Sequence, residues 1–202
     1  DDSGAVNTLN RAKAAVAEAG EPFFLFTNFV ESHMPIYIPR EWVMKYSGAS
    51  SKEVNNLVST DLLEVTYGDQ NLDINERDLL FDLHDASLAY LDMKISDFYD
   101  FLQKQGVADN TVFVVLSDHG DLYGEQGIWG HRGKIHRNLC RVPLLIRYPW
   151  DSPNVVQKPV SITGLFDPLV DISNGKRTAV ASDGPVFVEY SGEDETTLVE
   201  RG

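Results

Sequence analysis

The sequence is poor in cysteine, in long apolar runs and in basic residues, and each shortage excludes a class of protein. Its single cysteine, Cys140, rules out a disulfide within the 202 residues. No apolar run approaches the roughly 18 residues of a membrane span, and no basic N-terminal segment precedes an apolar one, so neither a span nor a signal peptide is predicted. With 17 Lys and Arg against 31 Asp and Glu, the net charge is −14, which disfavours nucleic-acid binding.

The composition is that of a folded protein but leaves its compartment open. Hydrophobic residues make up 43% of the chain, as in globular proteins and unlike disordered ones. We expect residues 1–202 to form a single domain, because this length can bury a sizeable core. The acidic excess fits a self-repelling soluble surface, or a protein of a halophile's high-salt cytoplasm, and on this basis the cytoplasm is favoured.

Two kinds of apolar pattern alternate along the chain, which predicts the α/β class. Spacings of three and four, or an Asp-Pro start, predict helices over residues 3–19, 75–105 and 167–172. Short β-branched and aromatic runs predict strands over residues 22–30, 112–116, 142–148, 160–163 and 186–190. Residues 35–73 have no sustained period and are expected to be loops with short helices. The predicted architecture is a mixed, mostly parallel sheet flanked by helices.

The strand at residues 112–116 is followed by two side chains that can bind a metal. Its continuous apolar run predicts a strand buried on both faces. Ser117, Asp118, His119 and Gly120 come next, and in open α/β sheets ligands lie beyond the carboxyl ends of the strands. Asp118 and His119 are therefore candidate metal ligands, an oxygen and a nitrogen donor respectively.

A basic segment without acidic residues follows. Between Gln126 and Trp150 there is no Asp or Glu, whereas the same segment contains Arg132, Lys134 and His131 together with further arginines. A donor-rich loop of this kind suits an anion such as sulfate or phosphate. The alternative is an ordinary turn after a strand, followed by a solvated basic loop.

His33 is a candidate anion-binding residue for a similar reason. It follows the predicted strand over residues 22–30. If that strand is parallel to the one over residues 112–116, His33 lies at the same edge of the sheet as Asp118. A lone histidine in a loop is otherwise a common surface residue.

These motifs resemble a known family. The resemblance covers roughly residues 20–175 and is to the C-terminal part of the sulfatase catalytic domain, in the alkaline-phosphatase-like superfamily. Its most specific part runs from the Ser-Asp-His-Gly motif at 117–120 to Arg-Val-Pro at 141–143. Further similar segments are Ser32–Pro35, Gly124–Gly127, Trp129–His131, Ala86–Asp92 and Phe166–Ile172.

The resemblance implies a site and a reaction. It implies that Asp118 and His119 bind a divalent cation, with Ca²⁺ expected. Mg²⁺ and Mn²⁺ are alternatives, because imidazole is a softer ligand than the amide that many family members have at the position of His119. It further implies that Lys134 and His33 bind sulfate oxygens and stabilise charge during catalysis. His131 and Arg132 are further candidates for the substrate pocket. The implied activity is metal-dependent hydrolysis of a sulfate monoester, in a sulfated small molecule or glycan.

The family's nucleophile has no counterpart in these 202 residues. Sulfatases use a formylglycine made from a Cys-x-Pro-x-Arg motif, whereas Cys140 is followed by Arg-Val-Pro. Asp1 and Asp2 lack the strand that precedes the family's metal-binding pair and are expected to lead a helix. We therefore expect the nucleophile-bearing N-terminal half of the domain to be absent, and this chain alone to be inactive. The alternatives are a phosphonate or phosphate ester hydrolase of the same superfamily and a non-catalytic anion-binding module.

Overall fold

The computed structural model describes residues 2–50, 52–53, 74–131, 135–181, 186–188 and 198–200. The chain divides into two compact units, one of residues 1–109 and 123–130 and the other of residues 110–122 and 131–202. Among its described residues, the first unit contains the helices α1 (Ala5–Glu18), α2 (Arg40–Ser47) and α5 (Ile74–Lys104). In the part of the chain that is described, no helix is long and apolar enough to cross a membrane.

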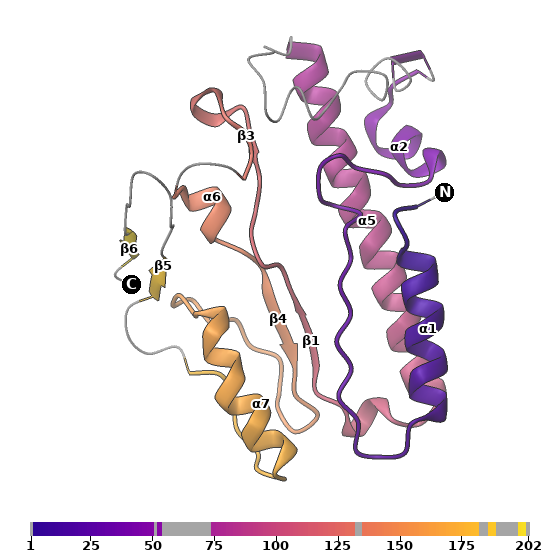
Figure 1. The fold of residues 1–202 in the computed structure, drawn as a ribbon, viewed down its shortest axis with the longest axis vertical. Coiled ribbons are helices and arrows are strands. Elements are labelled where there is room, and N and C mark those ends of the chain that lie inside the picture. Colours follow the sequence, from indigo (N-terminus) through magenta and orange to yellow (C-terminus); the bar gives the residue numbers. More distant parts are fainter. Residues whose placement is uncertain are drawn as a thin grey trace. The chain divides into compact units, whose positions relative to one another are not determined.

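The first unit is built around α5, against which α1 and α2 pack (Figure 1). Figure 1 shows α1 along the C-terminal half of α5 and α2 beside its N-terminal half. One stripe of α5 is buried, as the spacing of its apolar residues predicts. The core cluster contains residues from each of these helices and from the loop between α1 and α2, among them Ala5, Val43, Leu80, Tyr90, Met34 and Ile36.

Two carboxylates hold the beginning of α1. Buried Glu31 accepts hydrogen bonds from the backbone N–H groups of Ala5, at 2.6 Å, and Val30, at 3.2 Å. Asp2 accepts from the N–H groups of Gly4 and Val6 and from the hydroxyl of Tyr90, so it leads the helix as the sequence predicts. Negative charge here stabilises the helix, because the first N–H groups of a helix have no partner within it.

These contacts shift two pKa values. Burial raises the pKa of the Tyr90 hydroxyl, and its hydrogen bond to Asp2 raises it further, well above the ordinary range. Burial alone would raise the pKa of Asp2, but the hydrogen bonds from Tyr90, Val6 and Gly4 bring it below its ordinary value. Both shifts favour the same state, a neutral phenol that donates to a charged carboxylate.

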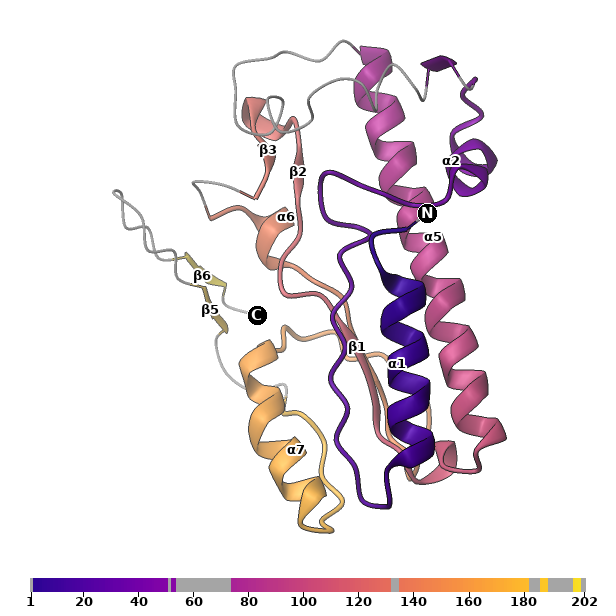
Figure 2. The ribbon, with the colours of Figure 1, turned by 45° about the vertical axis from the view of Figure 1, so that its right-hand side comes forward.

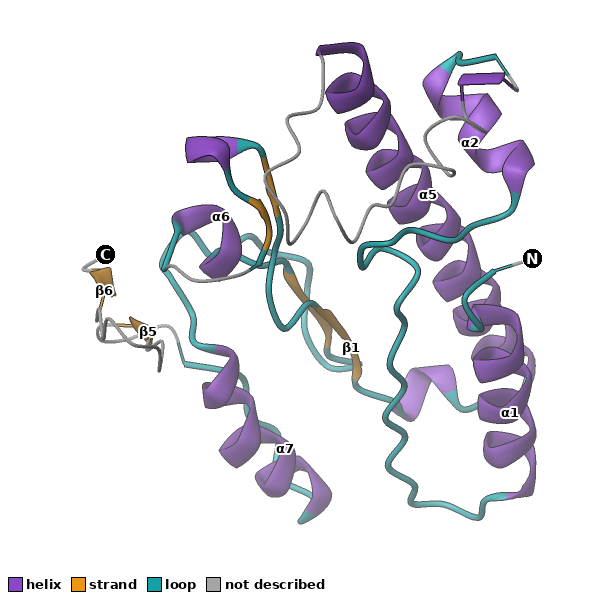
Figure 3. Cartoon of the chain, turned by 45° about the horizontal axis from the view of Figure 1, so that its top comes forward, coloured by secondary structure: helices purple, strands orange, loops and turns teal. Residues whose placement is uncertain are grey.

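The predicted strand over residues 22–30 is not formed, and this prediction was wrong. The segment is a loop between α1 and α2 (Figure 3). Its side chains nevertheless alternate between half-buried and exposed, and Phe24 and Phe26 are 79% and 77% exposed. Alternation of this kind is typical of extended backbone, but a strand also requires a hydrogen-bonded neighbour. No strand pairs with this segment among the residues described.

A small hairpin contributes two residues to the core of the first unit. Strands β2 (Leu122–Tyr123) and β3 (Trp129–Gly130) pair around the 3₁₀ turn η2 (Glu125–Gly127), as Figure 2 shows. Tyr123 and Trp129 are buried in the core cluster, and the Arg77 guanidinium lies 5.8 Å from the centre of the Trp129 ring. Gly124 has a φ of 95°, and a Cβ there would lie 2.9 Å from the Arg77 guanidinium, so this tight turn requires glycine.

The second unit contains an antiparallel strand pair. Strand β1 (Phe113–Leu116) pairs with β4 (Leu144–Arg147), with Phe113 opposite Arg147 and Leu116 opposite Leu144. Every strand pair whose direction is given within the described segments is antiparallel, so a mostly parallel sheet is not observed there. The prediction that β1 is buried on both faces was wrong, because a two-stranded sheet leaves Leu116 and Leu145 exposed, at 41% and 60%.

The rest of the second unit contains two predicted elements, two that were not predicted, α6 (Arg137–Cys140) and β6 (Leu198–Glu200), and one prediction that was wrong. Helix α6 precedes β4, helix α7 (Phe166–Ser173) confirms the helix predicted at the Asp-Pro pair, and β5 (Val186–Val188) pairs antiparallel with β6. The strand predicted over residues 160–163 was wrong, since the 3₁₀ turn η3 (Ile162–Leu165) occupies this place and continues into α7. Apolar residues that lead directly into a helix need no strand partner.

Candidate functional site

The turn after β1 is fixed by a side-chain hydrogen bond within the turn and by a backbone hydrogen bond to α6. Strand β1 ends at Leu116, and the Ser117 hydroxyl then donates to the carbonyl of His119 at 2.6 Å. The N–H of Gly120 donates to the carbonyl of Leu139 in α6, at 2.9 Å. A Cβ on Gly120 would overlap the carbonyl oxygen of Asn138, so only glycine allows the turn to approach α6 this closely. Asp118 and His119 therefore lie beyond the strand, on backbone that does not alternate between two faces.

Asp118 and His119 turn toward each other. Oδ1 of Asp118 lies 3.9 Å from Nε2 of His119 and also accepts a hydrogen bond from the His119 N–H, at 3.1 Å. Nδ1 of His119 lies 2.9 Å from the carbonyl oxygen of Gly120. Because a carbonyl can only accept, Nδ1 carries the proton and the lone pair of a neutral ring is on Nε2.

The pair fits part of a divalent-cation site. Protein ligands lie about 2.0–2.6 Å from such an ion, so an oxygen and a nitrogen 3.9 Å apart can both contact it. The Asp118 side chain is 85% exposed and the His119 side chain 34%, which leaves them accessible to an ion. Two ligands are fewer than the six to eight that Ca²⁺ takes, and metal binding by Asp118 and His119 stays a prediction.

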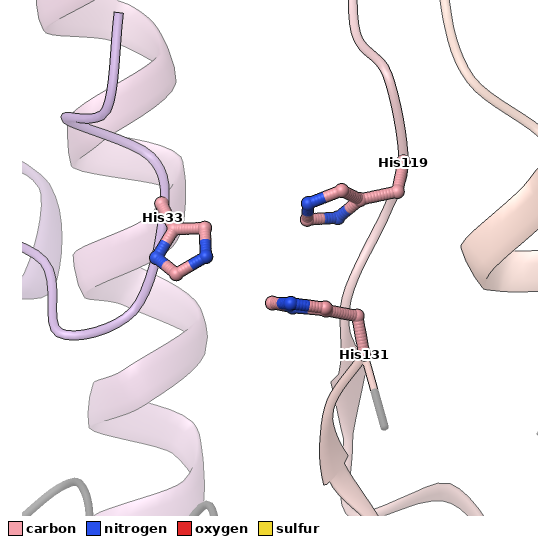
Figure 4. Close-up of side chains that lie close together, drawn as sticks. All are labelled: His33, His119 and His131. Carbon is pink, nitrogen blue, oxygen red and sulfur yellow. The ribbon is translucent and has the colours of Figure 1, made fainter. Parts of the chain in front are cut away.

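A second imidazole lies against His119. The rings of His119 and His131 have centroids 4.2 Å apart and planes inclined by 32°, and Figure 4 shows them facing one another. Nδ1 of His131 lies 3.0 Å from Oδ1 of Asp121, whose side chain is only 8% exposed. The carboxylate can only accept, so it fixes the proton of His131 on Nδ1. Sequence reasoning placed His131 in the substrate pocket but missed Asp121, which precedes the acid-free segment.

Of the remaining candidates, His33 belongs to the first unit and is also labelled in Figure 4. It is exposed, its N–H donates to the carbonyl of Val30 at 3.1 Å, and the Met34–Pro35 peptide bond that follows is cis. Lys134 and Arg132 lie outside the described residues, so their roles in binding sulfate stay predictions.

Comparison with known proteins supports one family. The sulfatase family model matches residues 6–175. The choline-sulfatase of Rhizobium meliloti is 27% identical, over 87% of this chain and 39% of its own length. The arylsulfatase of Clostridium perfringens is 28% identical, over 65% of this chain and 29% of its own length. The iduronate 2-sulfatase of Mus musculus is 25% identical, over 83% of this chain and 34% of its own length.

The family model matches most of this chain, whereas the chain matches only part of each relative. The chain spans between 29% and 39% of the length of these three relatives, so their activities belong to proteins that are much longer than 202 residues. The family match, in contrast, extends over most of this chain and includes the Asp118–His119 turn and the hairpin that follows it. The chain belongs to the sulfatase family.

Proposed function

We propose that the chain is the C-terminal part of the catalytic domain of a sulfuric ester hydrolase, an enzyme that hydrolyses sulfate monoesters. The observation that carries the proposal is the Asp118–His119 pair, which lies just beyond β1 inside the segment that matches the family. The relatives are named choline-sulfatase, arylsulfatase and iduronate 2-sulfatase, so sulfate is common to the names and the alcohol differs. The proposal is therefore confined to the sulfate ester of a small molecule or glycan.

In this proposal Asp118 and His119 supply two ligands to a divalent cation. When bound, such an ion polarises the ester and stabilises negative charge. Ca²⁺ is the expected ion, whereas Mg²⁺ or Mn²⁺ becomes more favourable because His119 offers a nitrogen in place of an amide oxygen. Because Nδ1–H of His119 donates to the Gly120 carbonyl, the lone pair that a neutral ring offers to the ion is on Nε2.

Lys134 and His33 are proposed to bind the sulfate oxygens and to stabilise the charge that develops on them. His131 and Arg132 are proposed to extend this pocket. The support is the acid-free sequence around Lys134, in which basic side chains have no carboxylate close in sequence.

The nucleophile and the rest of the sheet are proposed to lie in another part of a longer protein. No Cys-x-Pro-x-Arg motif occurs in the 202 residues, so a formylglycine would have to come from elsewhere. The exposed Phe24 and Phe26, on extended backbone with alternating burial, are suited to a strand that gains a neighbour there. A mostly parallel sheet would then form in the complete domain.

The test uses the longer protein that contains this chain, assayed with p-nitrophenyl sulfate and choline sulfate. Asp118→Asn and His119→Ala are each expected to lower turnover by about tenfold or more, because each removes a metal-ligand interaction. Asp151→Asn, which changes an exposed carboxylate in the same unit, is the matched control and should leave turnover unchanged. The 202-residue chain alone serves as the blank.

Two results would count against the proposal. One is hydrolysis of p-nitrophenyl phosphate with no activity on either sulfate ester, which would favour the phosphoryl-transfer branch of the superfamily. The other is full sulfatase activity in the Asp118→Asn and His119→Ala variants, which would remove the pair from the site.

A further inference from the structure

Arg77, near the beginning of α5, has a guanidinium group without an anionic partner among the described residues. Its Nε–H is buried and makes no hydrogen bond there. A carboxylate on the same helix could reach it from three or four residues later, but these positions are Leu80 and Phe81. Glu125 of the neighbouring hairpin uses Oε2 to accept from the Tyr123 N–H, at 2.6 Å. An unpaired guanidinium is unexpected in a chain whose 31 Asp and Glu outnumber its 17 Lys and Arg.

The surroundings of Arg77 hold the guanidinium in place and leave part of it accessible. Its Cζ lies 5.8 Å from the centre of the Trp129 ring, within the range of a cation–π contact. A Cβ on Gly124 would lie 2.9 Å from Nη2 of Arg77 and 3.2 Å from Cζ, so the guanidinium occupies the space that a side chain at Gly124 would need. The Arg77 side chain is half-buried, and all three residues belong to the first unit.

A guanidinium held in this way is suited to an oxyanion. Opposite charges attract more strongly at a partly buried site than in water. The planar fork of N–H groups matches two oxygens of a carboxylate or of a sulfate. Packing on Trp129 would account for the position of the group, but not for a partly buried charge with no counter-ion in the described residues. A bound anion would supply that counter-ion.

We propose that Arg77 binds an oxyanion, a sulfate or carboxylate group of a ligand, through the terminal amino groups of its guanidinium. Trp129 fixes the plane of the guanidinium, and Gly124 allows it to approach the hairpin closely. This site uses none of the residues proposed above for the metal or for the sulfate that is hydrolysed. It therefore goes beyond the proposed hydrolase activity and does not depend on it.

The experiment is ¹⁵N NMR of the full chain during titration with sodium sulfate and, separately, with sodium acetate. Sodium chloride keeps the ionic strength constant, because screening alone changes the attraction between charges. The Nε–H resonance of Arg77 and the indole N–H resonance of Trp129 should shift together and reach saturation. The titration with the lower dissociation constant shows whether the site prefers sulfate or a carboxylate.

Three variants, followed at the indole N–H of Trp129, test the residue itself. Arg77→Gln should weaken binding of the preferred anion by about tenfold or more, as for loss of a hydrogen bond to a charged group. Arg77→Lys keeps the charge but loses the planar fork, so it should also bind more weakly than the unsubstituted chain. Arg11→Gln removes an exposed arginine of α1 in the same unit and is the matched control, which should bind as the unsubstituted chain does.

Equal affinity in Arg77→Gln and the unsubstituted chain would overturn the proposal. So would shifts that do not saturate, or shifts that sodium chloride alone reproduces, because either would show a general effect of ions. If the variants fail to fold, the titration of the unsubstituted chain decides, since a saturable shift at Arg77 supports the site and its absence contradicts it. The hydrolase proposal is judged by turnover and this one by anion binding, so each can fail alone.

Discussion

Tyr90, in the middle of α5, donates a hydrogen bond of 2.6 Å to Oδ2 of Asp2, the same oxygen that accepts from the Val6 N–H in the first turn of α1. One carboxylate thus joins the beginning of one helix to the middle of another. Tyr90 is only 2% exposed, so this hydrogen bond is made at the edge of the core and not in open solvent.

Tyr90→Phe is expected to lower the free energy of unfolding by about 1–2 kcal/mol, because it removes a hydrogen bond to a charged acceptor. Urea unfolding followed by far-ultraviolet circular dichroism measures the change. Tyr46→Phe is the control, since Tyr46 is 43% exposed and its ring contact with Trp42 is kept, and it should change stability little. Equal losses in the two variants would mean that the hydroxyl of Tyr90 has no special role.

The same pair predicts a decline in stability at alkaline pH. The pKa of Tyr90 is raised in the folded protein by burial and by its hydrogen bond to Asp2. The stabilisation is therefore complete below the ordinary tyrosine pKa of about 10 and is lost as the pH rises through the folded value. Unfolding curves at increasing pH should show the wild type and Tyr90→Phe converging above about pH 10. Parallel curves throughout would contradict this prediction.

Glu31→Ala is expected to lower the free energy of unfolding by about 1–3 kcal/mol, because it leaves the buried N–H of Ala5 without its acceptor. Glu31→Gln keeps an oxygen that can accept this hydrogen bond and should lower the free energy of unfolding less. Glu18→Ala changes an exposed glutamate at the other end of the same helix and is the matched control. Thermal unfolding gives the order of the three variants, and a Glu31→Ala protein as stable as Glu18→Ala would be inconsistent with the contact.

Gly120→Ala is expected to destabilise the second unit by about 1–3 kcal/mol, because its Cβ would overlap the Asn138 carbonyl oxygen and push α6 away. Gly20→Ala is the control, since a Cβ on Gly20 meets nothing within 4 Å. Hydrogen exchange of the Gly120 amide, or of its alanine replacement, reports the loss directly. That amide should be protected in the wild type by its bond to Leu139 and not in the variant.

Lys134→Ala in the longer protein is expected to lower sulfatase turnover by roughly 10²- to 10³-fold, as for loss of one group that stabilises developing charge. Steady-state kinetics with p-nitrophenyl sulfate measures it. Lys158→Ala removes an exposed lysine of the same unit and should have little effect. Similar losses for both lysines would show that general positive charge, and not a positioned lysine, matters.

The helices were predictable because their signal is local. Residues 75–105 repeat apolar side chains at spacings of three and four, and α5 runs from Ile74 to Lys104. A helix makes its backbone hydrogen bonds within one segment, so its bounds follow from that segment alone. The strand over residues 22–30 has an equally clear apolar run, but a strand exists only with a neighbour that its own sequence does not specify.

The candidate site was predictable in part for the same reason. Asp118 and His119 are adjacent, and the strand that ends before them can be read from its own sequence, so their proximity follows from local sequence. Asp121 and His131 are in contact only because β2 and β3, which lie between them, pair as a hairpin and bring its two ends together. Neither residue has a sequence neighbour that indicates the other, and the path of the hairpin decides the contact.

The distance along the chain between Asp2 and Tyr90 also bears on how the protein is made. The two residues are 88 positions apart, and ribosomes add about 5–20 residues per second, so Tyr90 is synthesised roughly 4–18 s after Asp2. A helix as short as the 14 residues of α1 is marginal by itself in water. Glu31, only 26 positions from Ala5, is synthesised much sooner and can hold the start of α1 before α5 exists. During translation Asp2, through the N–H groups of Gly4 and Val6, and then Glu31 can therefore hold the beginning of α1 before Tyr90 joins it to α5.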